Sequence, residues 1–173
     1  GANFSLSAVT GPLISDVTQN VGAVADDQDL TITARVEPLN GAVDSVALAY
    51  RIMYGPETSI PMVDDGTGGD VMGGDGIYSA TIPASAAAPG EMVRWRVTST
   101  DVDGGRSQGP NFLDQVGTRQ SPQYHGTVVE DPALASDALP VFQWFSENER
   151  GARTRGGARV SVFYAGQFYD NAF

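Results

Sequence analysis

The residues with the most potential for chemistry are four aspartates in a glycine-rich stretch, residues 64–76. The stretch reads DDGTGGDVMGGDG, and its four carboxylates belong to Asp64, Asp65, Asp70 and Asp75. Bringing carboxylates within about 4 Å of one another costs on the order of 1 kcal/mol per pair in water, and more near a protein surface. Ca²⁺ offsets such repulsion, because it takes about six to eight oxygen ligands from carboxylates, backbone carbonyls and water. The pattern therefore predicts a structural calcium site with these four aspartates as ligands.

The same stretch has a second interpretation that needs no ion. Aspartate side chains in Asp/Gly turns accept hydrogen bonds from nearby backbone amides, so residues 64–76 also fit a solvated hairpin loop. The spacing of the acids is not that of an EF-hand, and the sequence leaves both interpretations open. Hydrolysis by a pair such as Asp64 and Asp75 is not expected, because a glycine-rich loop supports a rigid pair of carboxylates poorly.

Three other groups of residues are weaker candidates. A second acidic loop, residues 101–105 (DVDGG), either joins the first loop or forms a plain turn. Arginine clusters can clamp phosphate or carboxylate groups, although a solvated loop or a contact to another domain is favoured for the cluster here, which comprises Arg150, Arg153, Arg155 and Arg159. His125 has no nucleophile pattern around it and is expected to be a packed or exposed histidine.

Composition excludes several classes of function. The 173 residues contain no Cys and one His, which rules out disulfide scaffolds, thiolate sites and multi-His zinc sites. The net charge of −11 opposes nucleic acid and anionic lipid as partners. No apolar run approaches the length of a transmembrane helix, so no membrane insertion is expected.

Hydrophobic residues follow a period of two along much of the chain, which is typical of half-buried antiparallel strands. The alternation predicts strands at Leu13–Thr18, Leu30–Val36, Val46–Tyr54, Ile77–Ile82 and Val93–Val97. Six or seven short strands in about 100 residues indicate an all-β fold, an immunoglobulin- or fibronectin III-like β-sandwich. Trp95 is expected in its core.

The sequence divides into three parts. Residues 1–108 are predicted to form the Ig-like sandwich, and residues 109–139 a proline-containing linker that lies along it, with a short pairing near Tyr124–Val129. Residues 140–173 are predicted to be an aromatic-rich β-hairpin segment, with strands Val160–Tyr164 and Phe168–Asn171 joined by Ala165-Gly166.

The C-terminal segment carries too much apolar surface for 34 residues to bury alone. It is expected either to pack on the sandwich or to begin a larger, truncated domain. Strand edges left exposed in this way favour self-association.

Two parts of the sequence, residues 64–83 and the C-terminal tail, resemble known families. Residues 64–83 are similar to a motif of immunoglobulin-like modules in large bacterial secreted proteins. Residues 139–145 (LPVFQWF) and 159–171 (RVSVFYAGQFYDN) resemble the entry strands of spore-coat CotH-type proteins, where they lead into an atypical kinase-like domain. The resemblance implies a secreted or cell-surface bacterial protein. The catalytic and nucleotide-binding residues of that family would lie beyond Phe173, so none is assigned here.

These observations together predict a non-catalytic accessory or spacer module of a multidomain protein, stabilised by calcium and docked to a downstream domain. No enzymatic activity and no other cofactor are expected. The alternative is an adhesion-type module that binds a glycan or a protein.

Overall fold

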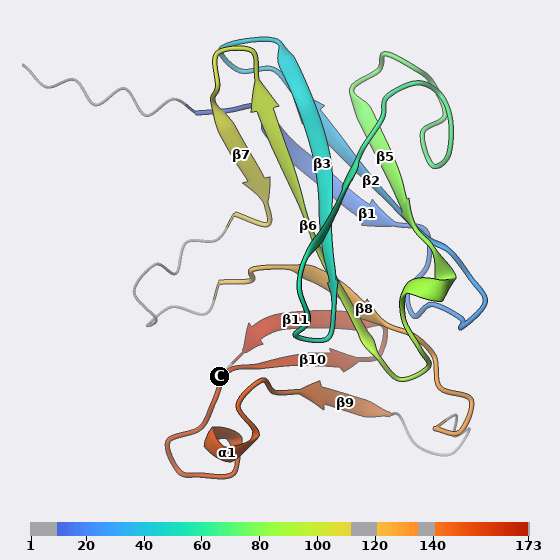
Figure 1. The fold of residues 1–173 in the computed structure, drawn as a ribbon, viewed down its shortest axis with the longest axis vertical. Helices are drawn as coiled ribbons and strands as arrows, with labels where there is room; N and C mark the ends of the chain where they lie inside the picture. The colour runs from blue at the N-terminus through green and yellow to red at the C-terminus, as the bar shows by residue number, and fades with distance from the viewer. Residues whose placement is uncertain (1–9, 112–120, 135–140, 173) are drawn as a thin grey trace, which may run out of the picture.

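A computed structural model describes residues 10–111, 121–134 and 141–172, which form antiparallel β-sheets (Figure 1). The first sheet has the order β1-β2-β5, made of Leu13–Gln19, Leu30–Glu37 and Ile77–Ile82. The second has the order β4-β3-β6-β7, made of Thr58–Pro61, Val43–Ile52, Met92–Asp101 and Arg106–Gly109. The prediction of an all-β, Ig-like fold is confirmed.

The core lies between these two sheets because alternate residues of each strand point inward. In β2 the buried residues alternate with half-buried threonines and an arginine, and the buried set is Leu30, Ile32, Ala34 and Val36. From the second sheet, Trp95 and Val97 of β6 face them, and Trp95 is 2% exposed. The predicted core position of Trp95 is confirmed.

One predicted strand ends early. The alternation suggests that the strand continues through Tyr54, but β3 ends at Ile52. The reason is local, because Met53 adopts a positive φ of 51°. This turn takes Tyr54 out of the sandwich and toward the C-terminal segment, where its hydroxyl donates to the carbonyl of Phe145.

A further strand comes from the segment that the sequence assigns to a linker. Strand β8, His125–Val128, pairs with the first half of β6, and β7 pairs with the second half. Because β3 occupies the other edge of β6, β7 and β8 follow each other along one edge. The pairing expected near Tyr124–Val129 is therefore present. Residues 1–9, 112–120 and 135–140 and Phe173 lie outside the described residues.

The C-terminal residues form a third sheet of order β11-β10-β9, with a short helix α1 between β9 and β10. Its elements are β9 Phe142–Phe145, α1 Glu149–Ala152, β10 Val160–Tyr164 and β11 Gln167–Ala172. The predicted hairpin of β10 and β11 is present. Strand β9 lies within residues 139–145, which the hydrophobic alternation did not assign to a strand and only the resemblance to entry strands indicated.

This third sheet lies across the end of β6 and beside β8 (Figure 1). Residues 92–95 of β6 are consecutively buried, whereas burial alternates farther along the strand. The sandwich core covers one face of β6 there, and the C-terminal sheet covers the other. The segment therefore packs on the sandwich, one of the two arrangements expected for it. No helix among the described residues is long and apolar enough to cross a membrane.

Candidate functional site

The Asp/Gly loop, residues 64–76, connects the end of the second sheet to β5 and folds back onto the first sheet. A bridge between Val63 and Ser79 closes its base, and the Ser79 hydroxyl donates to the carbonyl of Thr67 at 3.1 Å. Gly69 lies directly against β2, since an added Cβ there would be 2.5 Å from the Thr31 methyl group. The loop is thus held against the sheet.

Three of the four predicted aspartates come together. Asp64, Asp70 and Asp75 each place one carboxylate oxygen within 4.8 Å of the others, so that this group could hold a metal ion. Asp70 is 4% exposed and Asp75 is exposed. Asp65 is not part of the group, and its carboxylate accepts from the backbone and hydroxyl of Thr67 at 3.0 and 2.6 Å.

The same carboxylates also accept hydrogen bonds from backbone amides of the loop. Asp64 accepts from the amides of Gly74, Asp75 and Gly76 at 2.6, 3.3 and 2.9 Å. Gly76 has a φ of 82°, in the left-handed region that glycine adopts readily. Asp70 accepts from the amides of Gly66 and Met72. The second interpretation, aspartates that cap their own turns, is therefore also realised.

Amide bonds and an ion are compatible in this geometry. Each carboxylate oxygen accepts more than one interaction, and Ca²⁺ accepts water molecules among its ligands. Three carboxylates could thus bind an ion on one side while amides hold them on the other.

The second acidic loop does not join the first. Asp101 accepts from the amides of Asp103 and Gly105 at 3.0 and 2.7 Å, and the metal-ligand group found among the described residues contains neither Asp101 nor Asp103. Asp103 lies instead beside Gly41, where an added Cβ would be 2.7 Å from its carboxylate. Residues 101–105 form a plain turn.

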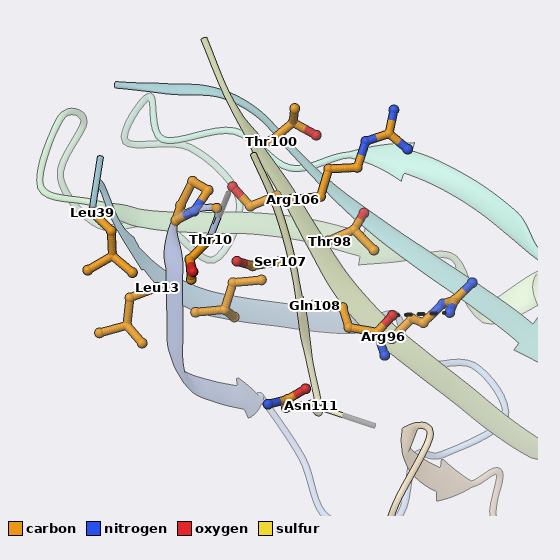
Figure 2. A pocket seen from close by; sticks show the side chains of 14 residues that line it. Thr10, Leu13, Leu39, Arg96, Thr98, Thr100, Arg106, Ser107, Gln108 and Asn111 are labelled. Atoms are coloured by element: carbon orange, nitrogen blue, oxygen red, sulfur yellow. Dashed lines mark hydrogen bonds between the residues drawn. The ribbon is translucent and has the colours of Figure 1, made fainter. Parts of the chain in front are cut away.

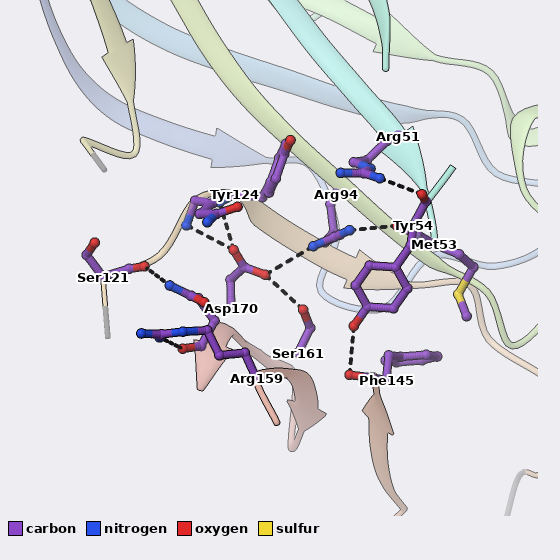
Figure 3. A network of polar contacts seen from close by, with 12 residues as sticks. Arg51, Met53, Tyr54, Arg94, Ser121, Tyr124, Phe145, Arg159, Ser161 and Asp170 are labelled. Atoms are coloured by element: carbon purple, nitrogen blue, oxygen red, sulfur yellow. Dashed lines mark hydrogen bonds and ion pairs between the residues drawn. The ribbon is translucent and has the colours of Figure 1, made fainter. Parts of the chain in front are cut away.

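A polar network that the sequence analysis missed joins the sandwich to the C-terminal sheet (Figure 3). Arg94 of β6 and Asp170 of β11 form an ion pair, Nη1 to Oδ1 3.5 Å, with side chains 6% and 2% exposed. Arg94 also donates to the carbonyl of Met53 at 2.8 Å. Its guanidinium lies 4.5 Å from the centre of the Tyr54 ring and 4.9 Å from that of Tyr124, so two aromatic rings flank the buried cation.

Asp170 is surrounded by donors. Its Oδ2 accepts from the amides of Gln123 and Tyr124 at 2.9 and 3.0 Å, and the hydroxyl of Ser161 donates to its Oδ1 at 2.8 Å. These donors come from β10 and from the segment before β8, so one carboxylate ties three parts of the chain. Local periodicity cannot reveal this contact. The feature of the sequence that could have indicated it is a charged residue within an otherwise apolar strand, as at Arg94 and Asp170.

Tyrosine hydroxyls extend the network. Tyr54 donates to the carbonyl of Phe145 at 2.7 Å, and burial raises the pKa of Tyr54 above its ordinary value, so the hydroxyl keeps the proton that it donates. Tyr124 donates to Glu57 at 2.9 Å, and Glu57 in turn pairs with Arg96 at 2.7 Å. The network therefore reaches from β9 to the outer face of the second sheet.

The other candidates from the sequence, the arginine cluster and His125, make contacts of a structural kind. Arg153 and Glu149 form a 3.9 Å pair with side chains 81% and 79% exposed, as expected for a solvated loop. Arg159 is not part of this ion pair, and its guanidinium donates to the carbonyl of Asn171. His125 stacks on Trp95, with ring centres 6.4 Å apart, and burial lowers its pKa, so it is a packed, neutral histidine at pH 7.

A hollow of about 690 Å³ lies beside β1, β6 and β7 (Figure 2). Threonine, serine, glutamine and arginine side chains line it, together with Leu13 and Leu39 at one side. No His, Cys, Asp or Glu occurs among these lining residues, so the described part of the hollow offers no general base.

Comparison with protein families assigns the sandwich. Residues 12–113 match the family described as conditioned medium factor 2nd Ig-like domain, a range that contains β1 to β7. No curated protein matches the chain. The family match ends before the C-terminal sheet, so the resemblance of that sheet to CotH-type proteins stays a prediction. Because the match covers more than half of the sequence, the chain belongs to the family of the second Ig-like domain of conditioned medium factor.

Proposed function

We propose that this chain is a non-catalytic accessory module of a secreted multidomain protein, in which the Ig-like domain holds the C-terminal sheet in a fixed orientation. The buried ion pair of Arg94 and Asp170 is the observation that carries this proposal. A buried charge is strongly unfavourable without its partner, so the pair favours one docked arrangement over others.

The outer face of the C-terminal sheet extends the proposal to a partner. Side chains alternate between the two faces of a strand, and the face opposite to Ser161 and Phe163 leaves Phe142, Trp144 and Tyr169 58%, 54% and 56% exposed. An exposed apolar patch of this kind marks an interaction surface. We assign it to a further domain of the same polypeptide, since a family described as a second Ig-like domain implies at least one other domain beside it.

The name of the family, conditioned medium factor, supports an extracellular location for the protein. Residues 139–145 and 159–171 resemble CotH-type proteins. On that resemblance, we also propose that the protein is a bacterial surface protein with a CotH-like domain after the Ig-like domain.

Calcium is proposed as the ion of the Asp/Gly loop. Asp64, Asp70 and Asp75 offer three oxygen ligands, the donor type that Ca²⁺ prefers. No Lys or Arg occurs from Ile52 to Val93, so nothing in that part of the sequence neutralises the loop. Bound calcium would hold the loop against the first sheet.

The docking role is tested by amide hydrogen exchange in the Asp170→Asn variant. We expect exchange to accelerate in β9, β10 and β11 while β2 and β3 stay protected, because the substitution removes the charge that Arg94 needs. Glu149→Gln, which removes the exposed carboxylate of a solvated ion pair, is the matched control. Unchanged protection of the C-terminal strands in Asp170→Asn would remove the docking role.

The outer surface is tested with a Trp144→Ser, Tyr169→Ser double variant of a longer polypeptide. We expect the variant to weaken interdomain contact, seen as a more extended shape in small-angle scattering, without unfolding the Ig-like domain. An unchanged shape, or retention of the unsubstituted chain on a glycan array, would favour a glycan-binding surface instead.

The ion is tested by melting the protein in calcium and in a chelator. We expect calcium to raise the melting temperature of the unsubstituted chain but not of Asp75→Asn. The side chain of Asp75 is exposed, so we expect this variant to fold. Asp16→Asn, on the exposed part of β1, is the control. A melting temperature that is the same with and without calcium would show that the aspartates serve only as hydrogen-bond acceptors for backbone amides.

A further inference from the structure

Three arginines gather on the outer face of the second sheet. Arg51 of β3 is paired in register with Arg94 of β6, and Arg96 lies two residues farther along the same face. Their guanidinium groups lie 5.8, 4.9 and 5.7 Å from the centre of one ring, that of Tyr124. Three positive charges therefore surround a single aromatic side chain.

Two carboxylates neutralise this group, and one positive charge remains. Asp170 pairs with Arg94 and Glu57 pairs with Arg96. No carboxylate of the described residues lies within ion-pair distance of Arg51. Its Nη2 donates to the carbonyl of Tyr54 at 2.5 Å, and its Nε is buried with no hydrogen-bond partner in the described structure. A buried donor without a partner is unfavourable.

A small cavity adjoins this unneutralised arginine. It lies between the Ig-like domain and the C-terminal sheet and measures about 140 Å³. Arg51, Arg94 and Arg159 line it together with Tyr54, Glu147 and Asp170. Figure 3 shows the guanidinium of Arg94 directed at Asp170 and that of Arg51 directed at the carbonyl of Tyr54. Since a water molecule takes about 30 Å³ of liquid volume, the cavity has room for an anionic group and a few waters.

From this arrangement we infer that the cavity binds a small oxyanion, a carboxylate or phosphate group, with Arg51 as its main ligand. Guanidinium groups donate to such anions through paired N–H groups, and these charge-assisted bonds are strong. Arg51 lines the cavity and has no carboxylate partner among the described residues, so one bound anion would neutralise its charge. This inference is independent of the calcium site and goes beyond the docking role.

The side chain of Glu147 is the internal competitor for the same position. Glu147 is exposed at the cavity rim, and its carboxylate has the chemistry of the proposed ligand. Removing its charge should therefore make the cavity bind an added anion more tightly.

The inference is tested by melting the protein in sodium phosphate, sodium acetate and sodium chloride at equal pH and ionic strength. A bound anion at about ten times its Kd is expected to raise the melting temperature by about 3 °C relative to chloride. Phosphate acting without acetate would identify a phosphate group, and both acting would identify a carboxylate-sized site. Arg51→Gln should lose the shift, whereas Arg35→Gln, on the other sheet, should keep it.

Glu147→Gln provides a second measurement that does not depend on the folding of Arg51→Gln. Calorimetric titration should show one phosphate or acetate bound per chain, several-fold more tightly than in the unsubstituted protein. The inference is overturned if neither anion stabilises more than chloride, if Arg51→Gln keeps the shift, or if Glu147→Gln binds no more tightly.

Discussion

Arg94 and Asp170 lie far apart in the sequence, yet they form a buried ion pair between the Ig-like domain and the C-terminal sheet. Both side chains have other partners, and those partners belong to different parts of the chain. Arg94 lies between the rings of Tyr54 and Tyr124, and Asp170 accepts from two backbone amides and from Ser161. The Ig-like domain and the C-terminal sheet are therefore joined by a pair that is stable only when both are in place.

Asp170→Asn should destabilise the protein by about 3 kcal/mol, because it leaves the Arg94 cation buried without its counter-charge. The amide oxygen keeps the shape and can still accept from the backbone amides, so the loss reports the charge. Urea denaturation measures it. Glu149→Gln should change the free energy of unfolding by less than about 0.5 kcal/mol, since exposed pairs contribute little. Equal effects of the two substitutions would contradict the role of the buried pair.

Gly126→Ala should loosen the contact between β8 and β11. An added Cβ at Gly126 overlaps the ring of Phe168, so the ring must turn away or the C-terminal sheet must shift. We expect a cost of about 1–2 kcal/mol, typical of overpacking, measured by thermal denaturation. Gly22→Ala is the control, because an added Cβ there meets nothing within 4 Å, and a similar loss in both variants would show that steric overlap is not the cause.

Gly69→Ala should detach the Asp/Gly loop from the first sheet. The new Cβ would lie 2.5 Å from the methyl group of Thr31 and 3.0 Å from that of Thr33, and these β-branched side chains cannot easily turn aside. A loss of about 1–3 kcal/mol is expected, together with faster hydrogen exchange at the amides bound by Asp64 and Asp70. Loop amides that exchange at the original rate would show that the loop does not depend on this close approach.

His125 should make the protein less stable as the pH falls from 7.5 to 5.5. Burial lowers the pKa of His125 in the folded state, with the nearby Asp170 opposing the shift, while the unfolded chain keeps a pKa of about 6.5. Below that value the unfolded state binds the proton first, so stability is lost until the pH passes the lower, folded-state pKa. The sequence has no other histidine.

The measurement for His125 is denaturation at several pH values, compared with His125→Phe, which keeps a ring on Trp95. The difference in stability between the two proteins should depend on pH in this interval. A constant difference would mean that His125 does not titrate differently in the folded and unfolded states.

Local pattern predicted much of the sandwich, because strands such as β2 and β6 have one face in the core and alternate accordingly. Local pattern failed where pairing with a neighbouring strand, rather than burial of one face, determines that a segment is a strand. The polar β7 (RSQG) is a strand because it pairs with β6, and β9 (FQWF) because it pairs with β10. Neither stretch alternates strongly enough to be recognised alone.

One of the candidate sites could be predicted from the local sequence, and the other could not. Acid density identified Asp64, Asp70 and Asp75, since these residues are close in the sequence and meet within one loop. The network of Arg94, Asp170 and Tyr54 depends on where the C-terminal sheet docks, which is a property of the tertiary structure. Local spacing therefore could not predict it.

The central claim is that Arg94 and Asp170 act together to hold the C-terminal sheet, and a double-mutant cycle tests it most directly. The free energy of unfolding is measured for the unsubstituted protein, Arg94→Met, Asp170→Asn and the double variant. The account predicts that the double variant is more stable than the sum of the two losses implies, with a coupling of about 1.5 kcal/mol or more. Losses that add to within about 0.3 kcal/mol would contradict it, because the two residues would then stabilise the protein independently.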